Sequence, residues 1–351
     1  MTLPTDSKNA SSPPPVHHRG DGFQNNYIEF EPQGLGPLLR WKLAAARQGL
    51  PKPPDAPTPR VAPDLAFLLA NAAGGEAMEP AAAWIGHATV LLQMGGRTFI
   101  TDPVFSDRSS PLSFAGPKRE GPPGLTAAEL PHVDVVLVSH NHYDHLDSAS
   151  VKALAAQRGG PPLFVVALGL KAWFADIGIE HVVELDWWQS ATVGSNEVFF
   201  VPAQHWSGRT LADRMKTLWG GYAVFAPDFQ AFFAGDTAYS KDFADIHGRF
   251  AERHGGADRG FDLALIPVGA YEPRWFMREQ HVNPAEAVQI HLDLVARRSV
   301  GIHWGTFQLT DEPLDAPPRA LAAAARERGL ADDAFTVMAI GETRRYPRRT
   351  P

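Results

Sequence analysis

The chain has 351 residues, of which 44% are hydrophobic and 20% charged, so it can bury a sizeable core as one large domain or two smaller ones. The formal net charge of −7 argues against a nucleic-acid partner, because binding a phosphate backbone requires a concentrated basic surface. The absence of cysteine excludes disulfides, thiolate metal sites and a cysteine nucleophile. Any transition metal must therefore be bound mainly by His, Asp and Glu, which suit zinc, manganese and iron.

The N-terminal part predicts a leader and an extension. Residues 1–20 are rich in Ser and Pro and poor in apolar groups, which predicts a disordered leader. Residues 21–79 form an extension in which Leu38 to Arg47 fits a short amphipathic helix, and a Pro-rich linker follows from Pro51. We expect this helix to pack on the main body, with a membrane surface as the alternative. Because the sequence shows neither an apolar secretory segment nor a membrane-spanning run, we expect a cytoplasmic protein that could also lie at the inner face of the membrane.

Residues 80–345 predict one α/β domain. A hairpin is expected from Thr89 to Ile100, with its turn at Gly95-Gly96. Further strands are expected at Val135–Val138, Leu163–Val166, Val198–Val201, Tyr222–Phe225, Ala231–Ala234, Leu263–Ile266 and Ser299–Ile302. Helices are expected at Ser148–Gln157, Asp242–Arg253, Pro284–Val295 and Arg319–Arg328, the third after an Asn283 cap. Strands that dominate first and helices that then interleave favour a layered α/β sandwich.

The densest group of metal-binding residue types follows the expected strand Val135–Val138. His140, His142, Asp144 and His145 occupy four of six consecutive positions. Loops at strand ends are where rigid scaffolds present functional groups. A tight loop can divide these four side chains into two sets, as two neighbouring metal ions require. An ordinary polar loop before a helix is the alternative interpretation.

Three more residues of ligand type each stand at the end of an apolar run. They are His205, Asp236 and His303, and each expected strand delivers one of them at its carboxyl end. Taken singly, each is more typical of a structural residue. Taken together with the six-residue run, they provide enough ligands to complete two coordination spheres.

The run from Ser139 to Asp147 resembles the signature of the metallo-β-lactamase superfamily, which implies a four-layer αββα sandwich with two zinc ions per chain. Eight other blocks are similar to N-acylphosphatidylethanolamine-hydrolysing phospholipase D, and the similarity extends over roughly residues 20–345. The blocks are Gly86–Thr89, Thr101–Ser106, Gly116–Arg119, Glu184–Trp188, Pro202–Trp206, Gly269–Trp275, Gln280–Glu286 and Ile302–Phe307.

This resemblance implies how the ligands are shared. Two triplets and a bridge are expected: His140, His142 and His205 on one zinc ion, Asp144, His145 and His303 on the other, and Asp236 between them. Two such ions generate a hydroxide near neutral pH, and we expect it to attack phosphorus in line. We predict a catalytic role for the carboxylates Asp144 and Asp236. Asp236 would hold the two ions at the required separation.

Other site residues are expected around the ligands. His87 and Asp102 are candidates for fixing the ligand imidazoles through their second nitrogen. Four residues are expected to contact substrate: Trp206, Tyr271, Gln280 and His281. By resemblance Gln280 and His281 border the active site, and Gln280 is the stronger candidate for substrate contact.

The resemblance implies cleavage of N-acylphosphatidylethanolamine to phosphatidic acid and an N-acylethanolamine. A phospholipid substrate, a peripheral membrane surface and a homodimer are the partners it implies. One alternative is a lactonase or another phosphoesterase, because the same hydroxide can attack a carbonyl carbon or phosphorus. Another is a metal- or lipid-binding protein without turnover, although such a protein would be expected to have lost a ligand and all seven are present.

Overall fold

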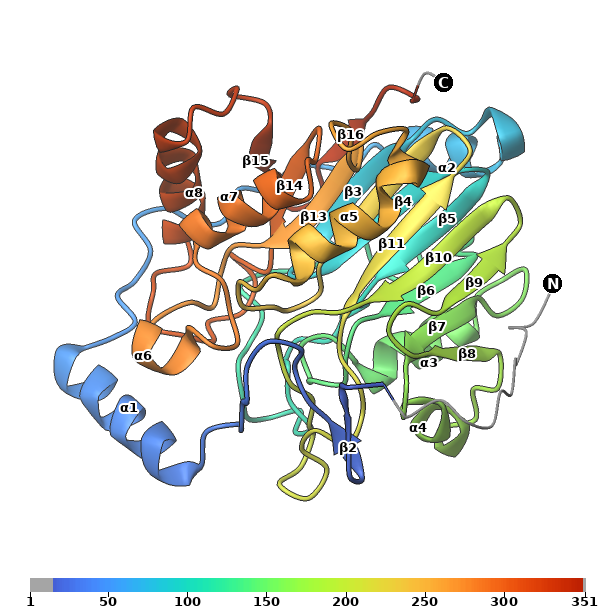
Figure 1. Ribbon diagram of the computed structural model, residues 1–351. Coiled ribbons are helices and arrows are strands. Elements are labelled where there is room, and N and C mark those ends of the chain that lie inside the picture. The colour runs from blue at the N-terminus through green and yellow to red at the C-terminus, as the bar shows by residue number, and fades with distance from the viewer. Residues whose placement is uncertain (1–14, 350–351) are drawn as a thin grey trace.

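Two seven-stranded β-sheets lie face to face at the centre of the computed structural model, which describes residues 15–349 (Figure 1). The first sheet contains β3 (Ala81–Gly86), β4 (Thr89–Met94), β5 (Arg97–Thr101), β6 (Val135–Val138), β7 (Leu163–Ala167), β8 (Val182–Leu185) and β16 (Thr343–Arg345). The second contains β9 (Ser190–Val193), β10 (Asn196–Val201), β11 (Gly221–Ala226), β12 (Phe229–Phe233), β13 (Leu263–Pro267), β14 (Ser299–Ile302) and β15 (Phe335–Val337).

The two sheets share one plan. In the first, β16, β3, β4 and β5 pair antiparallel, and β5, β6, β7 and β8 pair parallel. In the second, β9 to β12 pair antiparallel, and β12 to β15 pair parallel. Parallel strands that follow one another along the chain end at the same edge, so each sheet presents loops from its parallel half at that edge.

Helices cover the outer faces of both sheets. Those near the first sheet are α2 (Leu65–Ala72), α3 (Ser148–Ala155) and α4 (Lys171–Asp176), with the short 3-10 turn η1 (Gly75–Ala77) after α2. Those over the second are α5 (Asp242–His254), α7 (Pro284–Asp293) and α8 (Ala316–Glu327). The four-layer αββα sandwich expected from the sequence is therefore confirmed.

Burial explains why the central strands lack polar alternation. Each sheet is covered by the other sheet on one face and by helices on the other, so β4, β6, β7 and β11 are buried along their whole length. The Tyr222 hydroxyl of β11 donates to the carbonyl oxygens of Val138 and Val165, at 2.8 and 2.9 Å. This side chain fastens the second sheet to the end of β6, the strand that precedes the histidine-rich loop.

The strands and helices predicted from apolar runs are present with small shifts at their ends. The Asn283 cap is also confirmed: its side chain accepts from the Glu286 amide, the Glu286 side chain accepts from the Asn283 amide, and Pro284 is the first helical residue. The sequence reasoning missed β3, whose Ala-rich stretch Ala81–Gly86 lacks the β-branched residues that usually mark a strand.

The N-terminal extension packs on the domain. Residues 1–14 lie outside the described part of the chain, but residues 15–20, also assigned to the expected leader, contain strand β1 (His18–Arg19), which pairs with β2 (Gly22–Phe23). Helix α1 (Leu35–Gln48) contains the predicted amphipathic segment and packs through Trp41 and Ala45 against Met277 at the end of α6 (Arg274–Met277). In residues 15–349 no helix has the length and apolar character needed to span a bilayer.

Candidate metal centre

The seven predicted ligands converge at one edge of the sandwich. The His140–His145 loop follows β6, His205 follows β10, Asp236 follows β12 and His303 follows β14. Backbone hydrogen bonds join these loops: the Ala238 amide donates to the Gln204 carbonyl at 2.8 Å. The two sheets therefore bring together residues that lie up to 163 positions apart in the chain (140 to 303).

One cluster consists of His140, His142, His205 and Asp236, whose candidate ligand atoms all lie within 4.8 Å of one another. His142 Nδ1 is 2.8 Å from His140 Nε2 and 3.3 Å from His205 Nε2. Asp236 Oδ2 is 3.9 Å from His140 Nε2 and 3.8 Å from His205 Nε2. These are separations that the ligands of a single ion have from one another, since each would lie about 2 Å from it.

A second cluster consists of His87, Asp144, His145 and His303. Asp144 Oδ2 is 3.4 Å from His303 Nε2 and 3.6 Å from His145 Nε2. Asp236 reaches this cluster too, with Oδ1 3.1 Å from His303 Nε2 and Oδ2 3.0 Å from His145 Nε2. Asp236 is thus the side chain that reaches both clusters, and the resemblance implies that it bridges two ions.

Several buried polar atoms in these clusters have no hydrogen-bond partner within residues 15–349. They are His87 Nδ1, His142 Nε2 and His303 Nδ1, together with His281 Nδ1 beside the clusters. A buried polar atom without a partner costs about 1–3 kcal/mol, so such a group requires an explanation. Nitrogen and carboxylate donors around one point are the donor set that zinc binds, and the residues therefore fit a divalent metal pair.

The pKa shifts of most of these His and Asp side chains favour the protonation states that bind a cation. Burial lowers the pKa of His142 to about 3 and the pKa of His205 to about 4, which keeps both imidazoles neutral. Burial opposes ionisation of Asp236, yet the surrounding imidazoles, led by His145 and His303, hold its pKa well below the usual range. For His303 burial is outweighed by Asp236 and Asp144, which raise its pKa to about 9. The proton on His303 offsets the negative charge of Asp236 and Asp144, and a bound cation would offset the same charge.

Asp102, which follows β5, contacts His145 and Ser139 on the buried side of the site. Its Oδ2 is 2.6 Å from His145 Nδ1 and accepts from the Ser139 hydroxyl at 2.6 Å, while Oδ1 accepts from the Ser139 amide at 2.7 Å. The same Ser139 hydroxyl lies 2.9 Å from His140 Nδ1. One buried carboxylate therefore orients an imidazole in each cluster, with Nε2 turned toward Asp236, as expected for groups behind metal ligands.

His87 lies closer to the ligands than the sequence predicted. Its Nε2 is 3.1 Å from Asp144 Oδ2, and its ring centroid is 3.9 Å from that of His303. His87, Asp102 and His303 have φ angles of 55°, 31° and 62°, in the left-handed region that residues with a Cβ rarely adopt. The His303 amide donates to the His87 carbonyl at 3.0 Å, which joins two of these residues. Backbone strain of this kind concentrates at functional sites.

Glycine at position 235 permits the close approach of two site loops. A Cβ built on Gly235 would lie 2.7 Å from the Ser139 Cβ and 2.7 Å from the Gly220 carbonyl oxygen, and its φ is +62°. Gly235 directly precedes Asp236, and Ser139 directly precedes His140. The absence of a side chain therefore sets the distance between the shared carboxylate and the histidine-rich loop.

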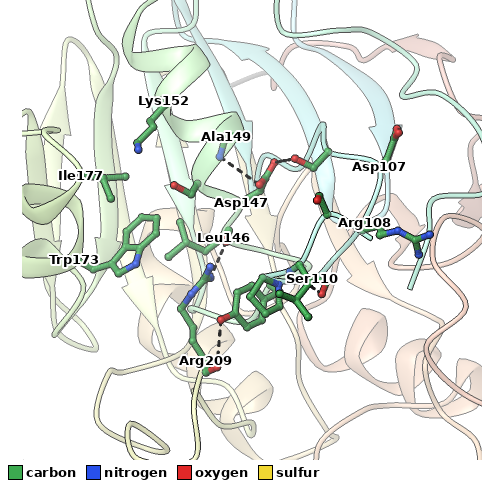
Figure 2. A pocket seen from close by; sticks show the side chains of 16 residues that line it. Asp107, Arg108, Ser110, Leu146, Asp147, Ala149, Lys152, Trp173, Ile177 and Arg209 are labelled. Carbon is green, nitrogen blue, oxygen red and sulfur yellow. Dashed lines mark hydrogen bonds between the residues drawn. The ribbon is translucent and has the colours of Figure 1, made fainter. Parts of the chain in front are cut away.

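Arg209 supports the histidine-rich loop from outside, and the sequence reasoning missed it. Its Nη1 donates to the carbonyl oxygens of Asn141 and Leu146, at 2.9 and 2.7 Å, and its guanidinium group lies over the Tyr143 ring. Figure 2 shows Arg209 reaching Leu146 at the wall of a pocket of about 840 Å³ that Trp173 also lines. None of the seven ligand candidates lines this pocket, although Tyr143 and Leu146 beside them do.

The four residues predicted to contact substrate occupy different places. Gln280 Oε1 accepts from Trp206 Nε1 at 2.7 Å and Gln280 Nε2 donates to the Phe276 carbonyl, so partners within the chain occupy this side chain. Trp206 contacts the His142 ring edge-on, with 4.3 Å between centroids. His281 Nδ1 is buried, unpartnered and 3.9 Å from Asp236 Oδ2. Tyr271 is half-buried, and its amide donates to Glu312 on a loop beside the site.

Comparisons with known proteins identify the family and the fold of this chain. The family described as "Beta-lactamase superfamily domain" matches residues 97–304. An uncharacterised protein of Mycobacterium tuberculosis is 43% identical over 294 residues, 82% of this chain and 73% of its own. N-acyl-phosphatidylethanolamine-hydrolyzing phospholipase D 1 of Caenorhabditis elegans is 41% identical over 273 residues, 74% of each chain. The structure of a possible metal-dependent hydrolase from Veillonella parvula has a similar fold, with a TM-score of 0.60 at 17% identity over 76% of this chain and 99% of that chain.

Proposed function

The chain belongs to the β-lactamase superfamily and is a metal-dependent hydrolase, and we propose that it is a binuclear zinc phosphodiesterase of the phospholipase D type. The proposed reaction cleaves N-acylphosphatidylethanolamine to phosphatidic acid and an N-acylethanolamine. The observation that supports it most is the pair of His/Asp clusters that share Asp236, with ligand-type atoms that are buried and unpartnered.

The residues would divide between two zinc ions along the two clusters. One ion would be held by His140, His142 and His205, the other by Asp144, His145 and His303, with Asp236 common to both. When bound, a pair of such cations acidifies a water molecule and draws negative charge from the oxygens of a phosphodiester. His87 touches Asp144 and holds that carboxylate in the second cluster.

The chain's own groups perform the remaining tasks. Asp102 fixes a proton on His145 Nδ1 and so leaves Nε2 free as a ligand. Among the four predicted substrate residues, we assign direct contact with the phosphodiester to His281, because its Nδ1 is unpartnered and close to Asp236. Gln280 acts instead through its backbone, because its carbonyl oxygen accepts from His205 Nδ1 at 2.8 Å and orients that ring.

A lipid substrate is supported by the relatives and by the surface of α1. The C. elegans relative is named for hydrolysis of N-acylphosphatidylethanolamine, and its identity extends over three quarters of this chain. In α1, Leu35, Leu39 and Leu43 are 61%, 68% and 53% exposed, and their spacing of four places them on one face. A row of exposed leucines suits insertion into the headgroup region of a bilayer.

The charge of α1 supports the same contact. Its sequence Leu35–Gln48 contains Arg40, Lys42 and Arg47 and no acidic residue, which favours anionic lipid headgroups. The opposite face is held on the domain, because Trp41 packs on Met277 and its indole donates to Asp311 at 2.7 Å. Figure 1 shows α1 at the outside of the molecule, beside α6. We propose that α1 places the enzyme on a membrane surface while remaining attached to the domain.

The proposal is tested by metal analysis together with a lipid panel. The purified chain is expected to contain about two zinc ions and to hydrolyse N-acylphosphatidylethanolamine in mixed micelles, with phosphatidic acid as product. Plain phosphatidylethanolamine, a soluble phosphodiester and a lactone serve as comparison substrates. Inactivity on the N-acylated lipid together with turnover of the lactone or the soluble ester would move the assignment to another hydrolase of the superfamily. Metal binding without turnover of any of these substrates would contradict the proposed hydrolytic activity.

A further inference from the structure

Asn25 contacts both backbone groups of His205 through its side-chain amide. Asn25 Nδ2 donates to the His205 carbonyl at 3.0 Å, and the His205 amide donates to Asn25 Oδ1 at 3.0 Å. Trp219 Nε1 also donates to Asn25 Oδ1, at 3.1 Å. Asn25 is buried, and these three bonds fix the orientation of its amide.

His205 depends on this contact because it lies beyond the end of its strand. Strand β10 ends at Val201, so at His205 the neighbouring strand no longer supplies a ladder partner. His205 is completely buried, and a buried backbone group left without a partner costs as much as a lost hydrogen bond. The side chain of Asn25 takes the place of a neighbouring strand for this one residue.

The segment that carries Asn25 is attached to the domain at several points. His17 Nε2 and His18 Nε2 lie 2.6 and 2.7 Å from the two carboxylate oxygens of Asp186, and the His17 ring packs on Trp187. The Phe23 amide donates to the Met215 carbonyl at 2.8 Å. Residues 15–26 therefore form a docked segment. Its one buried amide side chain, that of Asn25, is hydrogen-bonded to the backbone of His205, a predicted metal ligand.

We propose that Asn25 is a positioning residue for His205, and that the docked N-terminal segment thereby sets the affinity of the cluster that contains His140, His142 and His205 for its metal ion. The inference rests on the proposed binuclear centre. The imidazole of His205 is held by Gln280 at Nδ1, and its backbone is held by Asn25. Loss of the second contact lets the Cα of His205 move, which shifts Nε2 away from His142 and Asp236.

The test measures zinc affinity in the full chain carrying Asn25→Ala, by competition with a chromophoric chelator. We expect one of the two zinc ions to bind about 10- to 100-fold more weakly, as for other residues that orient metal ligands, and the other ion to keep its affinity. Cobalt substitution gives a second readout, because the absorption bands of one site are expected to change in Asn25→Ala and those of the other to persist.

Asn26→Ala is the matched control. Asn26 is the next residue, and its Nδ2 donates to Asp242 Oδ1 at 2.7 Å, so this variant also removes a hydrogen bond of the docked segment but none to a ligand. It is expected to bind both zinc ions as the wild type does. Asn25→Asp is a second variant for the case that Asn25→Ala does not fold. It keeps the shape and the acceptor but loses the donor to the His205 carbonyl, and should weaken the same ion.

Two outcomes would overturn the role of Asn25. One is equal affinity for both ions in wild type, Asn25→Ala and Asn25→Asp. The other is an equal loss of both ions together with a fall in melting temperature, which indicates a general effect on the fold. A wild-type chain that takes up fewer than two zinc ions would instead contradict the proposed centre, so the two failures are distinguishable.

Discussion

Asp102 Oδ2 lies 2.6 Å from His145 Nδ1, and both side chains are completely buried. Burial raises the pKa of the Asp102 carboxyl, whereas His145, although buried, has its pKa raised well above the usual range by Asp236, Asp144 and Asp102. The contact fixes which nitrogen of His145 faces Asp236. It also joins the loop after β5 to the loop after β6, so two neighbouring strands of the first sheet set the orientation of the His145 ring.

Asp102→Asn is therefore expected to weaken zinc binding by about 10- to 100-fold, because the amide orients the His145 ring less firmly and leaves the Ser139 contacts poorly matched. Chelator competition measures the change. Asp176→Asn, an exposed carboxylate on α4, is the control and should leave affinity unchanged. Wild-type affinity in Asp102→Asn would show that His145 is oriented by other contacts.

Asp236→Asn is expected to reduce turnover by more than about 100-fold, a larger effect than loss of an orienting residue. The amide retains one acceptor oxygen but has neither the negative charge nor the second ligand oxygen that the shared position requires. Steady-state hydrolysis and zinc content by elemental analysis are the measurements, with circular dichroism to verify the fold. Asp176→Asn, which changes an exposed carboxylate on α4, serves as control. Unchanged turnover would refute the bridging role.

Gly235→Ala is expected to lower the free energy of unfolding by about 1–3 kcal/mol, because the new Cβ meets Ser139 and the Gly220 carbonyl at a positive φ. Urea denaturation of the metal-free chain measures it. Gly248→Ala is the matched control: a Cβ at Gly248 in α5 meets nothing within 4 Å, so this change should stabilise the helix by up to about 1 kcal/mol. Equal effects of the two substitutions would contradict the close approach at Gly235.

Leu39→Gln combined with Leu43→Gln is expected to weaken binding to vesicles of anionic phospholipid by about 100-fold, since burial of each leucine in lipid contributes about 1.5 kcal/mol, or about tenfold in affinity. Vesicle co-sedimentation measures this, and activity on a soluble phosphodiester should be unaffected. Leu69→Gln controls for loss of an exposed leucine elsewhere, because Leu69 is 47% exposed on α2, far from α1 in Figure 1. Unaltered vesicle binding of the double variant would remove α1 from the membrane contact.

His291 predicts a stability change in mild acid. Burial lowers the pKa of His291 from 6.5 to about 4, and its Nδ1 lies 2.8 Å from the Ser299 hydroxyl. Between these two pH values the unfolded chain binds a proton that the folded chain excludes, so the free energy of unfolding falls as pH decreases from 6.5 to 4. His291→Gln removes this contribution. In urea titrations of metal-free protein the variant should lose stability less steeply across this range, and parallel profiles would contradict the assignment.

Much of the fold follows from local pattern. Strands such as Val135–Val138 were predictable because the central strands are buried on both faces and are continuous apolar runs. Helix α7 was predictable because Asn283, Pro284 and Glu286 encode its start locally. Strand β3 was missed because its Ala-rich stretch lacks β-branched residues, and β16 was missed because its partner, β3, is distant in the chain. The pairing of β16 with β3, between Arg344 and Ala82, has no local signal.

At the candidate metal centre, residue types and spacing indicated the ligand candidates: four within six residues, and His205, Asp236 and His303 each after an apolar run. Residue type and spacing are local properties, so they can be recognised without a structure. The contacts around these residues could be identified only from the packed fold. Asn25 contacts His205 across 180 positions, and Arg209 contacts the histidine-rich loop across more than 60. Such contacts depend on how the two sheets pack. No local sequence pattern predicts them.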